Sequence, residues 1–269
     1  MKRFISSCSL ILVLFLLISF VFSCFNGKDL ITDPDQTSES TDSSSDSDNL
    51  VPEEPEISSI DFSEMNYIAY GDSITWGLYN SQRMEFPYPS LVSTTLGLKS
   101  YKNSGVNGAT LCSNDKGYFC MTDKILSNTE KADIISVMLG VNDYNRNLPL
   151  GTINDTDNTT IYGSLNLIAN HFDTYYEDSF VFFMTPYKER FAGGDSFRIN
   201  SQGYNLMDVS NAIIEVAALH GYPVLDMFNY GRFEIEYKAP ESDGVHPSQT
   251  FVRDYTTPQI VEFIRKNCK

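Results

Sequence analysis

Short apolar runs alternate with amphipathic stretches along the chain from Met65 onward. The runs are rich in β-branched and aromatic residues, which is typical of strands, whereas apolar positions between them recur at helical spacing. Leu206, Val209 and Ile213, for example, share one helical face. This alternation predicts an α/β domain with a parallel sheet covered by helices on both faces. The predicted strands are 66–70, 99–103, 133–139, 179–185 and 223–227, and the predicted helices are 89–96, 122–129, 161–176, 204–220 and 249–266.

Two connections between the predicted elements are unusually long. Residues 144–160 and 186–203 exceed the few residues that normally join a strand to a helix. Both begin at the carboxyl end of a predicted strand, where open α/β sheets place their ligands. We therefore expect these two loops to shape a binding site. Within the second loop, the run Lys188, Glu189 and Arg190 is interpreted as a solvated group of charges rather than as an anion site.

The first residues of the chain have the pattern of a targeting segment. Two basic residues precede the nearly apolar run 10–22, which is as long as the hydrophobic region of a secretory signal and short for a membrane span. The run ends in Val-Phe-Ser-Cys, which resembles a bacterial lipobox whose cysteine is Cys24. This resemblance implies that residues 1–23 are a lipoprotein signal peptide and that lipid is attached to the Cys24 sulfur. The alternative is an ordinary signal peptide that is cut nearby, with Cys24 incidental.

Residues 24–62 have a composition that cannot form a core. They are rich in Ser, Asp, Glu and Pro with little apolar surface to bury, so we expect a disordered acidic tether that its own charge keeps extended. Residues 63–269 then form one globular domain. With lipid at one end of the tether and the domain at the other, the sequence predicts an exported protein anchored to a bacterial membrane, with its domain outside the cytoplasm.

Charge and cysteine content exclude several classes of partner. The formal net charge is −16, and no basic face of the kind that nucleic acid needs is visible, so nucleic acid is not an expected partner. In an exported domain Cys112 and Cys120 could close a small loop by a disulfide, which leaves Cys268 unpaired. Because the sequence has no CxxC motif and no cluster of Cys and His, we expect neither a metal nor another cofactor.

Four short polar blocks follow predicted strands or precede the last helix. They read GDSIT at 71–75, NSGVNGAT at 103–110, GVND at 140–143 and DGVHP at 243–247. Because parallel strands bring their carboxyl ends to one edge of a sheet, we expect the blocks to meet there. Together they contain the residue types that acyl transfer by a serine requires.

Each block supplies one part of such a site. The Ser73 hydroxyl needs a base, and His246 is the expected one, with Asp243 accepting a hydrogen bond from its other ring nitrogen. The Ser73 N–H, the Gly108 N–H and the Asn142 amide can donate to a developing oxyanion. The other two histidines lie in predicted helices and are interpreted as structural, namely His171 and His220.

The four blocks, in this order, resemble those of the SGNH (GDSL-type) hydrolase family, and the resemblance covers essentially the whole domain. It implies a flavodoxin-like three-layer α/β/α sandwich around a mostly parallel five-stranded sheet of order 2-1-3-4-5, and a reaction that needs no metal. The residues that match the family's site are Ser73 as nucleophile, Gly108 and Asn142 as oxyanion donors, and Asp243 with His246 as the orienting acid and the base.

Other residues beside the blocks have less specific interpretations. Gly105 is expected to be a turn glycine, and Asp72 and Asp143 are expected to brace the loops that hold Ser73 and Asn142. Four aromatic residues follow the blocks or the strand ends, where they either contact the substrate or fill the rim and the core. These are Trp76, Tyr79, Tyr144 and Tyr187.

The sequence as a whole therefore predicts a serine esterase that hydrolyses carboxylic esters through an acyl-enzyme. The expected substrates are O-acetyl or other short acyl groups on carbohydrates, because a surface tether and the lack of an obvious long apolar lid favour glycans. One alternative is a lipase, lysophospholipase or thioesterase that acts on acyl lipids. Another is a non-catalytic glycan-binding lipoprotein on an esterase scaffold, since a fold alone does not grant activity.

Overall fold

The structure, a computed structural model, describes residues 60–190, 195–238 and 240–269. The predicted signal peptide, Cys24 and almost all of the predicted tether lie outside these residues, so the structure does not test them. The described residues belong to one compact unit, Ile57–Lys269. Within them, no helix has the length and apolar character that crossing a membrane requires.

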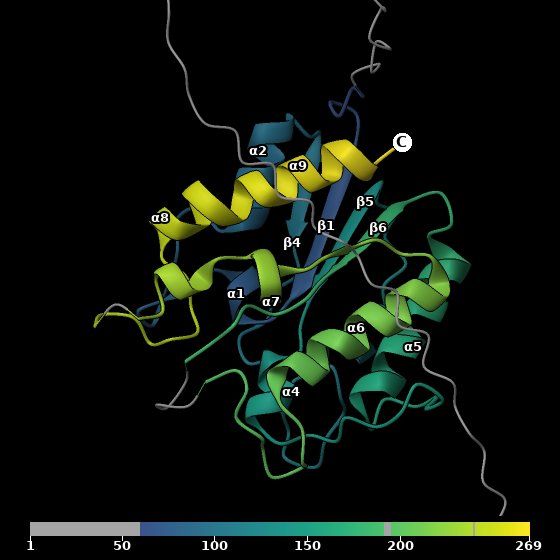
Figure 1. Cartoon of the computed structure of the whole chain (residues 1–269). Coiled ribbons are helices and arrows are strands. Elements are labelled where there is room, and N and C mark those ends of the chain that lie inside the picture. Colours follow the sequence, from purple (N-terminus) through teal and green to yellow (C-terminus); the bar gives the residue numbers. More distant parts are fainter. Residues whose placement is uncertain (1–59, 191–194, 239) are drawn as a thin grey trace, which may run out of the picture. The chain divides into compact units, whose positions relative to one another are not determined.

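A five-stranded parallel sheet forms the centre of the domain (Figure 1). Its spatial order is β4-β1-β5-β6-β7, which is 2-1-3-4-5 when the five strands are numbered along the chain, as predicted. Parallel pairing runs without a break from one edge to the other. The strands are β1 (Asn66–Gly71), β4 (Ser100–Asn103), β5 (Ile134–Met138), β6 (Phe180–Met184) and β7 (Val224–Leu225).

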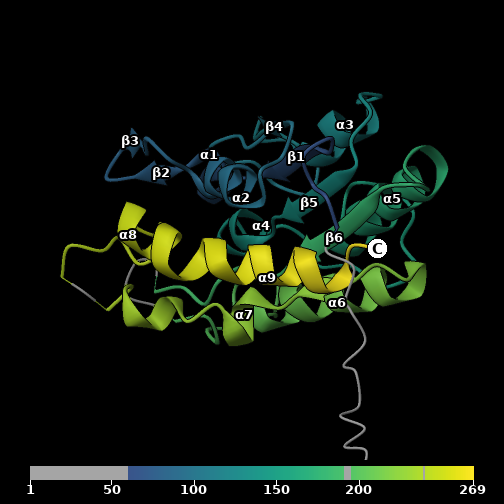
Figure 2. The same ribbon diagram turned by 90° about the horizontal axis from the view of Figure 1, so that it is seen from above.

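Helices cover both faces of this sheet, as Figures 1 and 2 show. One face carries α2 (Tyr88–Leu96) and α9 (Thr257–Asn267), which pack against each other. The other face carries α3 (Met121–Leu126), α5 (Ile161–Tyr175) and α6 (Leu206–His220). The domain is therefore the flavodoxin-like three-layer α/β/α sandwich that the sequence predicted.

Side chains alternate along each central strand between two separate cores. In β1, Ile68 and Tyr70 join the core under α5 and α6, whereas Tyr67 and Ala69 join the core under α2 and α9. All four are at most 2% exposed. Burial on both faces explains why the strand sequences are continuously apolar instead of alternating. Each large apolar side chain that is removed from water in this way stabilises the fold by about 1.5–3 kcal/mol.

Helix α6 shows how local sequence sets an element's ends. The Asn205 side chain accepts hydrogen bonds from the N–H groups of Met207 and Asp208, and the Asp208 carboxylate accepts one from the Asn205 N–H. This reciprocal capping starts the helix at Leu206, two residues later than predicted. Gly221 ends it with φ 74°, in the left-handed region that favours glycine.

The final predicted helix, 249–266, is interrupted in the structure. It consists of α8 (Gln249–Phe251), a π-helical turn (Val252–Thr256) and α9. Pro258 lies in the first turn of α9 and has no N–H to donate to the carbonyl four residues earlier. A widened turn before it is therefore a natural consequence of the sequence.

Several short elements could not be predicted because they have too few residues to show a helical or strand period in the sequence. Between β2 (Leu78–Tyr79) and β3 (Gln82–Arg83), the two turn residues have φ of 47° and 62°, as a tight hairpin requires. The predicted strand 223–227 is shorter than expected, because Asp226 caps the next helix. The other short elements are α1 (Ser73–Trp76), α4 (Val141–Asn145), α7 (Met227–Tyr230) and a 3₁₀ turn at Phe233–Ile235.

The three cysteines of the domain are free thiols. Cys112 is buried, and the Cys120 Sγ instead donates a hydrogen bond of 3.2 Å to the Leu111 carbonyl. The disulfide between Cys112 and Cys120 that the sequence left open is therefore not formed.

Candidate active site

Ser73 lies directly after the carboxyl end of β1, at the first position of α1. Asp72 caps this short helix by accepting a hydrogen bond of 2.9 Å from the Ile74 N–H. The helix folds back so tightly on the strand that a Cβ at Gly71 would lie only 1.9 Å from the Thr75 Oγ1. Glycine at 71 thus lets the chain turn so sharply that Ser73 is held at the edge of the sheet.

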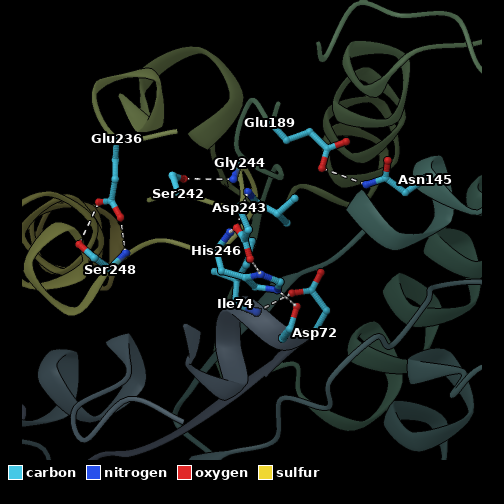
Figure 3. Close-up of polar contacts among 12 residues, drawn as sticks. Asp72, Ile74, Asn145, Glu189, Glu236, Ser242, Asp243, Gly244, His246 and Ser248 are labelled. Atoms are coloured by element: carbon cyan, nitrogen blue, oxygen red, sulfur yellow. Dashed lines mark hydrogen bonds and ion pairs between the residues drawn. The ribbon is translucent and has the colours of Figure 1, made fainter. Parts of the chain in front are cut away.

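The structure brings Ser73, His246 and Asp243 into one hydrogen-bonded chain. The Ser73 Oγ lies 2.8 Å from the His246 Nε2. The His246 Nδ1 in turn lies 2.6 Å from the Asp243 Oδ2, a contact that Figure 3 shows. The second Asp243 oxygen accepts hydrogen bonds from the N–H groups of Val245 and His246. With Nδ1–H donated to the carboxylate, Nε2 is free to accept the serine proton, as a general base must.

The electrostatics of the acid fit this arrangement. Burial alone would raise the pKa of Asp243, but hydrogen bonds from the His246 ring and from two backbone N–H groups outweigh it and hold this pKa at about 2. The Asp243 carboxylate therefore stays ionised near neutral pH, where it can stabilise an imidazolium on His246.

Contacts on both sides hold the loop that carries Asp243 and His246. The Arg190 N–H donates to the Gly244 carbonyl at 2.8 Å, and Gly244 itself has φ 81°. A Cβ at Gly244 would lie 2.5 Å from the Arg190 carbonyl oxygen, so this close approach requires glycine. Beyond the loop, the Glu236 carboxylate accepts hydrogen bonds from the N–H and the hydroxyl of Ser248 at 2.5 and 3.0 Å (Figure 3).

Asn142 and Gly108, two of the three predicted oxyanion donors, lie close to each other, and Asn142 also lies next to Asp72. Asn142, the second residue of α4, donates from its Nδ2 to the Ala109 carbonyl at 3.0 Å and approaches the Asp72 Oδ2 at 3.4 Å. Gly108, one residue before Ala109, has φ 71°. Among the described residues, none accepts a hydrogen bond from the Gly108 N–H. This group is therefore available to an oxyanion.

Arg146 fixes the Gly108 turn, a role that the sequence analysis missed. Its guanidinium donates to the Gly108 carbonyl and lies 3.9 Å from the centroid of the Tyr118 ring. This contact fixes the carbonyl of Gly108 and with it the turn that presents the Gly108 N–H. The sequence signal that could have shown this role is the arginine four positions after Asn142, since side chains at this spacing share a helix face.

Gly105 has the structural role that was expected of it. A Cβ there would lie 2.3 Å from the Trp76 backbone nitrogen, so this glycine allows the 103–110 block to pack against the end of α1. The Asn103 Nδ2 supports the same contact by donating a hydrogen bond of 2.7 Å to the Thr75 carbonyl. The block is thereby fixed beside Ser73 by its backbone.

Two buried aspartates brace the site. Both oxygens of Asp143 accept hydrogen bonds of 3.0 Å from the N–H groups of Leu111 and Cys112, which ties α4 to the segment that follows Gly108. Burial raises the pKa of Asp143. Burial also raises the pKa of Asp72 to about 6, although the hydrogen bond from Ile74 and the charge of His246 lower it. Both aspartates have the bracing role that was expected of them.

The predicted charge run at 188–190 is not solvated as a whole. Arg190 is exposed, but Glu189 is only 4% exposed and accepts a hydrogen bond of 2.9 Å from the Asn145 Nδ2. Burial raises the pKa of Glu189 to about 7, while Asn145 and the charge of Arg198 lower it. The interpretation of Glu189 as a solvated charge is therefore wrong, because the segment bends its side chain inward against α4.

The four candidate aromatic residues divide into two pairs. Trp76 and Tyr79 are partly exposed near Ser73, and the Arg83 guanidinium lies 5.2 Å from the Trp76 ring centroid. Tyr144 and Tyr187 are at most 2% exposed. Their hydroxyls contact the Arg198 carbonyl at 2.7 Å and the Thr256 Oγ1 at 2.6 Å. Tyr144 and Tyr187 are core residues in this structure, which does not fit the substrate contact that was considered for them.

The remaining histidines lie away from this constellation. The His171 Nε2 is 3.3 Å from the Asn128 carbonyl, and the His220 Nδ1 is 2.6 Å from the Asp173 carboxylate. His171 lies on α5 and His220 on α6, and both are held by protein partners, in agreement with their structural interpretation. Within residues 60–190, 195–238 and 240–269, no three His, Cys, Asp or Glu side chains gather as metal ligands would.

Comparison with known protein families gives one match that spans most of the domain. A family model described as the GDSL-like lipase/acylhydrolase family matches residues 69–251, a segment that contains all four blocks. Among curated proteins, no sequence matches the chain.

Solved structures share the fold over nearly their full length. A protein from Lactobacillus plantarum is 25% identical with a TM-score of 0.65, over 77% of this chain and 99% of that one. A possible lipase from Chitinophaga pinensis is 24% identical with a TM-score of 0.60, over 76% and 98%. A carbohydrate acetylesterase family member from Sinorhizobium meliloti is 18% identical with a TM-score of 0.53, over 75% and 98%.

Replacing Asn142 by Ala should lower kcat by about 10²–10³-fold, because one donor to the oxyanion is lost. KM should change little, since the donor acts mainly in the transition state. The measurement is hydrolysis of a chromogenic ester such as p-nitrophenyl acetate. Asn170→Ala, on an exposed position of α5, is the matched control and should retain the wild-type rate. An unchanged kcat in the Asn142 variant would contradict this role.

Replacing Asp72 by Asn should change how stability depends on pH. The pKa of Asp72 is raised to about 6 in the folded protein, so the folded state binds a proton more tightly than the unfolded state. Most of the stability from this group is thus present at pH 4 and is lost as pH rises to 7, a change of about 2 kcal/mol. The Asn variant lacks this loss, so its free energy of unfolding relative to wild type should improve over that interval. Urea unfolding at pH 4 and pH 7 measures it, and an equal difference at both pH values would refute the assignment.

Proposed function

The chain belongs to the GDSL-like lipase/acylhydrolase family, the SGNH hydrolases, and on this premise we propose that it removes O-acetyl or other short acyl groups from carbohydrates. As a member of this family it is a serine hydrolase of the esterase class. The observation that carries the proposal is the hydrogen-bonded chain from Ser73 through His246 to Asp243, with two oxyanion donors beside it. The identity of the substrate goes beyond the family and needs separate support.

The geometry accounts for each step of ester hydrolysis. His246 takes the Ser73 proton as the Oγ attacks the ester carbonyl carbon, and Asp243 stabilises the imidazolium. The N–H groups of Ser73 and Gly108 and the Asn142 amide donate to the tetrahedral oxyanion. His246 then returns the proton to the leaving alcohol, which leaves an acyl-serine. Water, activated in the same way, attacks this ester and releases the acid and free Ser73.

Polar side chains on α4 and in the loop after β6 support a carbohydrate substrate. Asn142 and Asn145 lie on α4, and Glu189 is hydrogen-bonded to the second of them. Such groups suit an alcohol that carries further hydroxyls, whereas a lipid chain needs a continuous apolar surface. One structural neighbour is named as a carbohydrate acetylesterase family member, which is consistent with this class of substrate.

A specific hollow favours the main alternative, an enzyme that acts on acyl lipids. A cavity of about 260 Å³ beside Ser242 is lined by Tyr79, Phe251, Tyr255 and other residues. Ser242 precedes the catalytic acid, so an acyl chain in this cavity would lie close to the reacting ester. A neighbour named as a possible lipase agrees with this alternative, which includes lysophospholipase and thioesterase activity.

The esterase proposal predicts that the full-length chain, purified in detergent, hydrolyses p-nitrophenyl acetate. Ser73→Ala should lose about 10⁴- to 10⁶-fold in kcat, because the nucleophile is gone. Ser63→Ala changes an exposed serine before β1 and serves as the control that keeps the wild-type rate. If wild type is no faster than Ser73→Ala, the chain is a non-catalytic binding protein on an esterase scaffold.

Chain-length preference separates glycan from lipid in the same experiment. We expect kcat/KM to fall from p-nitrophenyl acetate to the long-chain esters, and acetylated xylan to be deacetylated faster than a lysophospholipid is cleaved. A strong preference for long acyl chains would overturn the carbohydrate proposal in favour of the lipid one.

We further propose that Cys24 carries a lipid that anchors the protein to a bacterial membrane. The support is the sequence before it, which resembles a lipobox. In a bacterial host fed a labelled fatty acid, Cys24→Ser should abolish labelling and release the protein from the membrane fraction. Cys8→Ser, within the predicted signal peptide, is the control and should leave both unchanged. A Cys24→Ser protein that keeps its label would rule out the anchor.

A further inference from the structure

Glu189 and Asn145 form a hydrogen-bonded polar pair in which Glu189 is buried and Asn145 is partly buried (Figure 3). No step of the ester hydrolysis described above uses this pair. Asn145 follows Asn142 by three positions on α4. Side chains at this spacing are neighbours on a helix, with about 5–6 Å between their Cβ atoms. The pair is thus one helical turn away from the amide that donates to the oxyanion.

On its other side the pair adjoins the loop of the catalytic acid and base. Arg190, the residue after Glu189, donates its N–H to the Gly244 carbonyl at 2.8 Å. The charges of Asp72 and His246 both act on the Glu189 carboxyl group. The segment of Glu189 therefore connects α4, which carries Asn142, with the loop that carries His246.

The backbone of Glu189 is fixed in this position. Its N–H donates to the Ser196 Oγ at 2.6 Å, and its carbonyl accepts from the same hydroxyl at 3.1 Å. Ser196 is itself buried. A carboxylate on such a support loses little conformational freedom when it binds a ligand, which is the requirement for a selective contact.

Two oxygen atoms of the pair have no donor among the described residues. The Asn145 Oδ1 is buried without a hydrogen-bond partner. Of the two Glu189 oxygens, only Oε2 has a described partner, the Asn145 Nδ2. Buried acceptors are almost always satisfied in folded proteins, so an unsatisfied one beside a reaction site calls for a donor that arrives with the substrate.

We propose that Glu189 and Asn145 bind a free hydroxyl group on the alcohol part of the ester, next to the carbon that carries the acyl group. Glu189 is then a residue that determines specificity: it selects esters of polyols and sugars over esters of simple alcohols. The inference rests on the proposed function and deepens it, since it names the feature of the alcohol that the site recognises. A hydroxyl supplies the missing donor, whereas an alkyl alcohol leaves the acceptors unpaired.

The charge of Glu189 strengthens this contact at mildly alkaline pH. Burial raises its pKa to about 7, against the opposing effects of Asn145, Arg198 and His246, and with a further increase from Asp72. Above that pH the group is an ionised acceptor, and hydrogen bonds to a charged acceptor are roughly twice as strong as those between neutral groups. Selection for hydroxylated esters should therefore be measured at about pH 8.

Two esters with the same acyl group and the same carbon chain isolate the effect of the hydroxyls. Glyceryl monoacetate and propyl acetate differ only in the two hydroxyl groups of the alcohol. With the full-length enzyme in detergent, titration of released acid gives kcat/KM for each. Wild type should prefer glyceryl monoacetate, and E189Q should lower this preference by about tenfold, chiefly through a higher KM for glyceryl monoacetate. Glu177→Gln removes the same charge at an exposed position before β6 and should keep the wild-type ratio.

The outcomes are distinguishable. Equal hydrolysis of both esters by wild type, or an unchanged ratio in E189Q, overturns the inference and leaves the esterase proposal intact. A loss in E189Q that is the same for both esters shows a merely structural role and overturns it too. Failure of wild type to hydrolyse either ester refutes the proposed function itself. If E189Q melts at a much lower temperature, Asn145→Ala is the second variant, and it should lower the ratio in the same direction.

Discussion

The hydrogen bond between the Ser73 Oγ and the His246 Nε2 is the interaction on which the rest of the structure converges. It joins residues 173 positions apart, and neither residue holds the other in place. Ser73 is held by the sharp turn after β1, whereas His246 is held by Asp243 and by the contact of Gly244 with Arg190. Because each partner is positioned by its own surroundings, the pair is aligned before a substrate binds. Such prior alignment is a main source of enzymatic rate acceleration.

Three carboxylates are buried around this pair, and each connects segments that the sheet alone would leave apart. Asp72 joins α1 to the Asn142 amide, Asp143 joins α4 to the segment after Gly108, and Glu189 joins the loop after β6 to α4. Burial raises the pKa of all three, so each destabilises the folded protein as pH rises. The site thus keeps three buried carboxyl groups although they lower the stability of the folded protein as pH rises. Such perturbed pKa values are common at functional sites.

The centre of the sheet was predictable from the sequence because β1, β5 and β6 are buried on both faces. Residues such as Ile68, Ile135 and Val181 leave continuous apolar runs whose ends can be located within one or two positions. The site blocks were predictable for a related reason, since each follows such a run or precedes the last helix. The order of the strands came from the resemblance to a family, whereas the roles of the blocks came first from the chemistry of their residues and then from that resemblance.

What the sequence could not show depends on the direction of single side chains in irregular segments. Nothing in Lys188-Glu189-Arg190 distinguishes the buried residue from its neighbours, because a loop has no period that relates position to exposure. Tyr144 likewise follows a polar block and resembles a rim residue, yet it turns into the core. Helix α4 has five residues, which are too few to show a helical pattern in the sequence, although it carries both Asn142 and Asn145.

The packing of α2 against α9 has a consequence for the growing chain. During synthesis, Ser73 emerges 173 residues before His246, an interval of roughly 9–35 s at ordinary rates of translation. From their own synthesis until α9 follows, Phe182 and Met184 lack the cover that this helix gives to their face of the sheet. The nascent chain is therefore inactive and prone to aggregate until its last helix has packed. The onset of activity thus marks the completion of the fold.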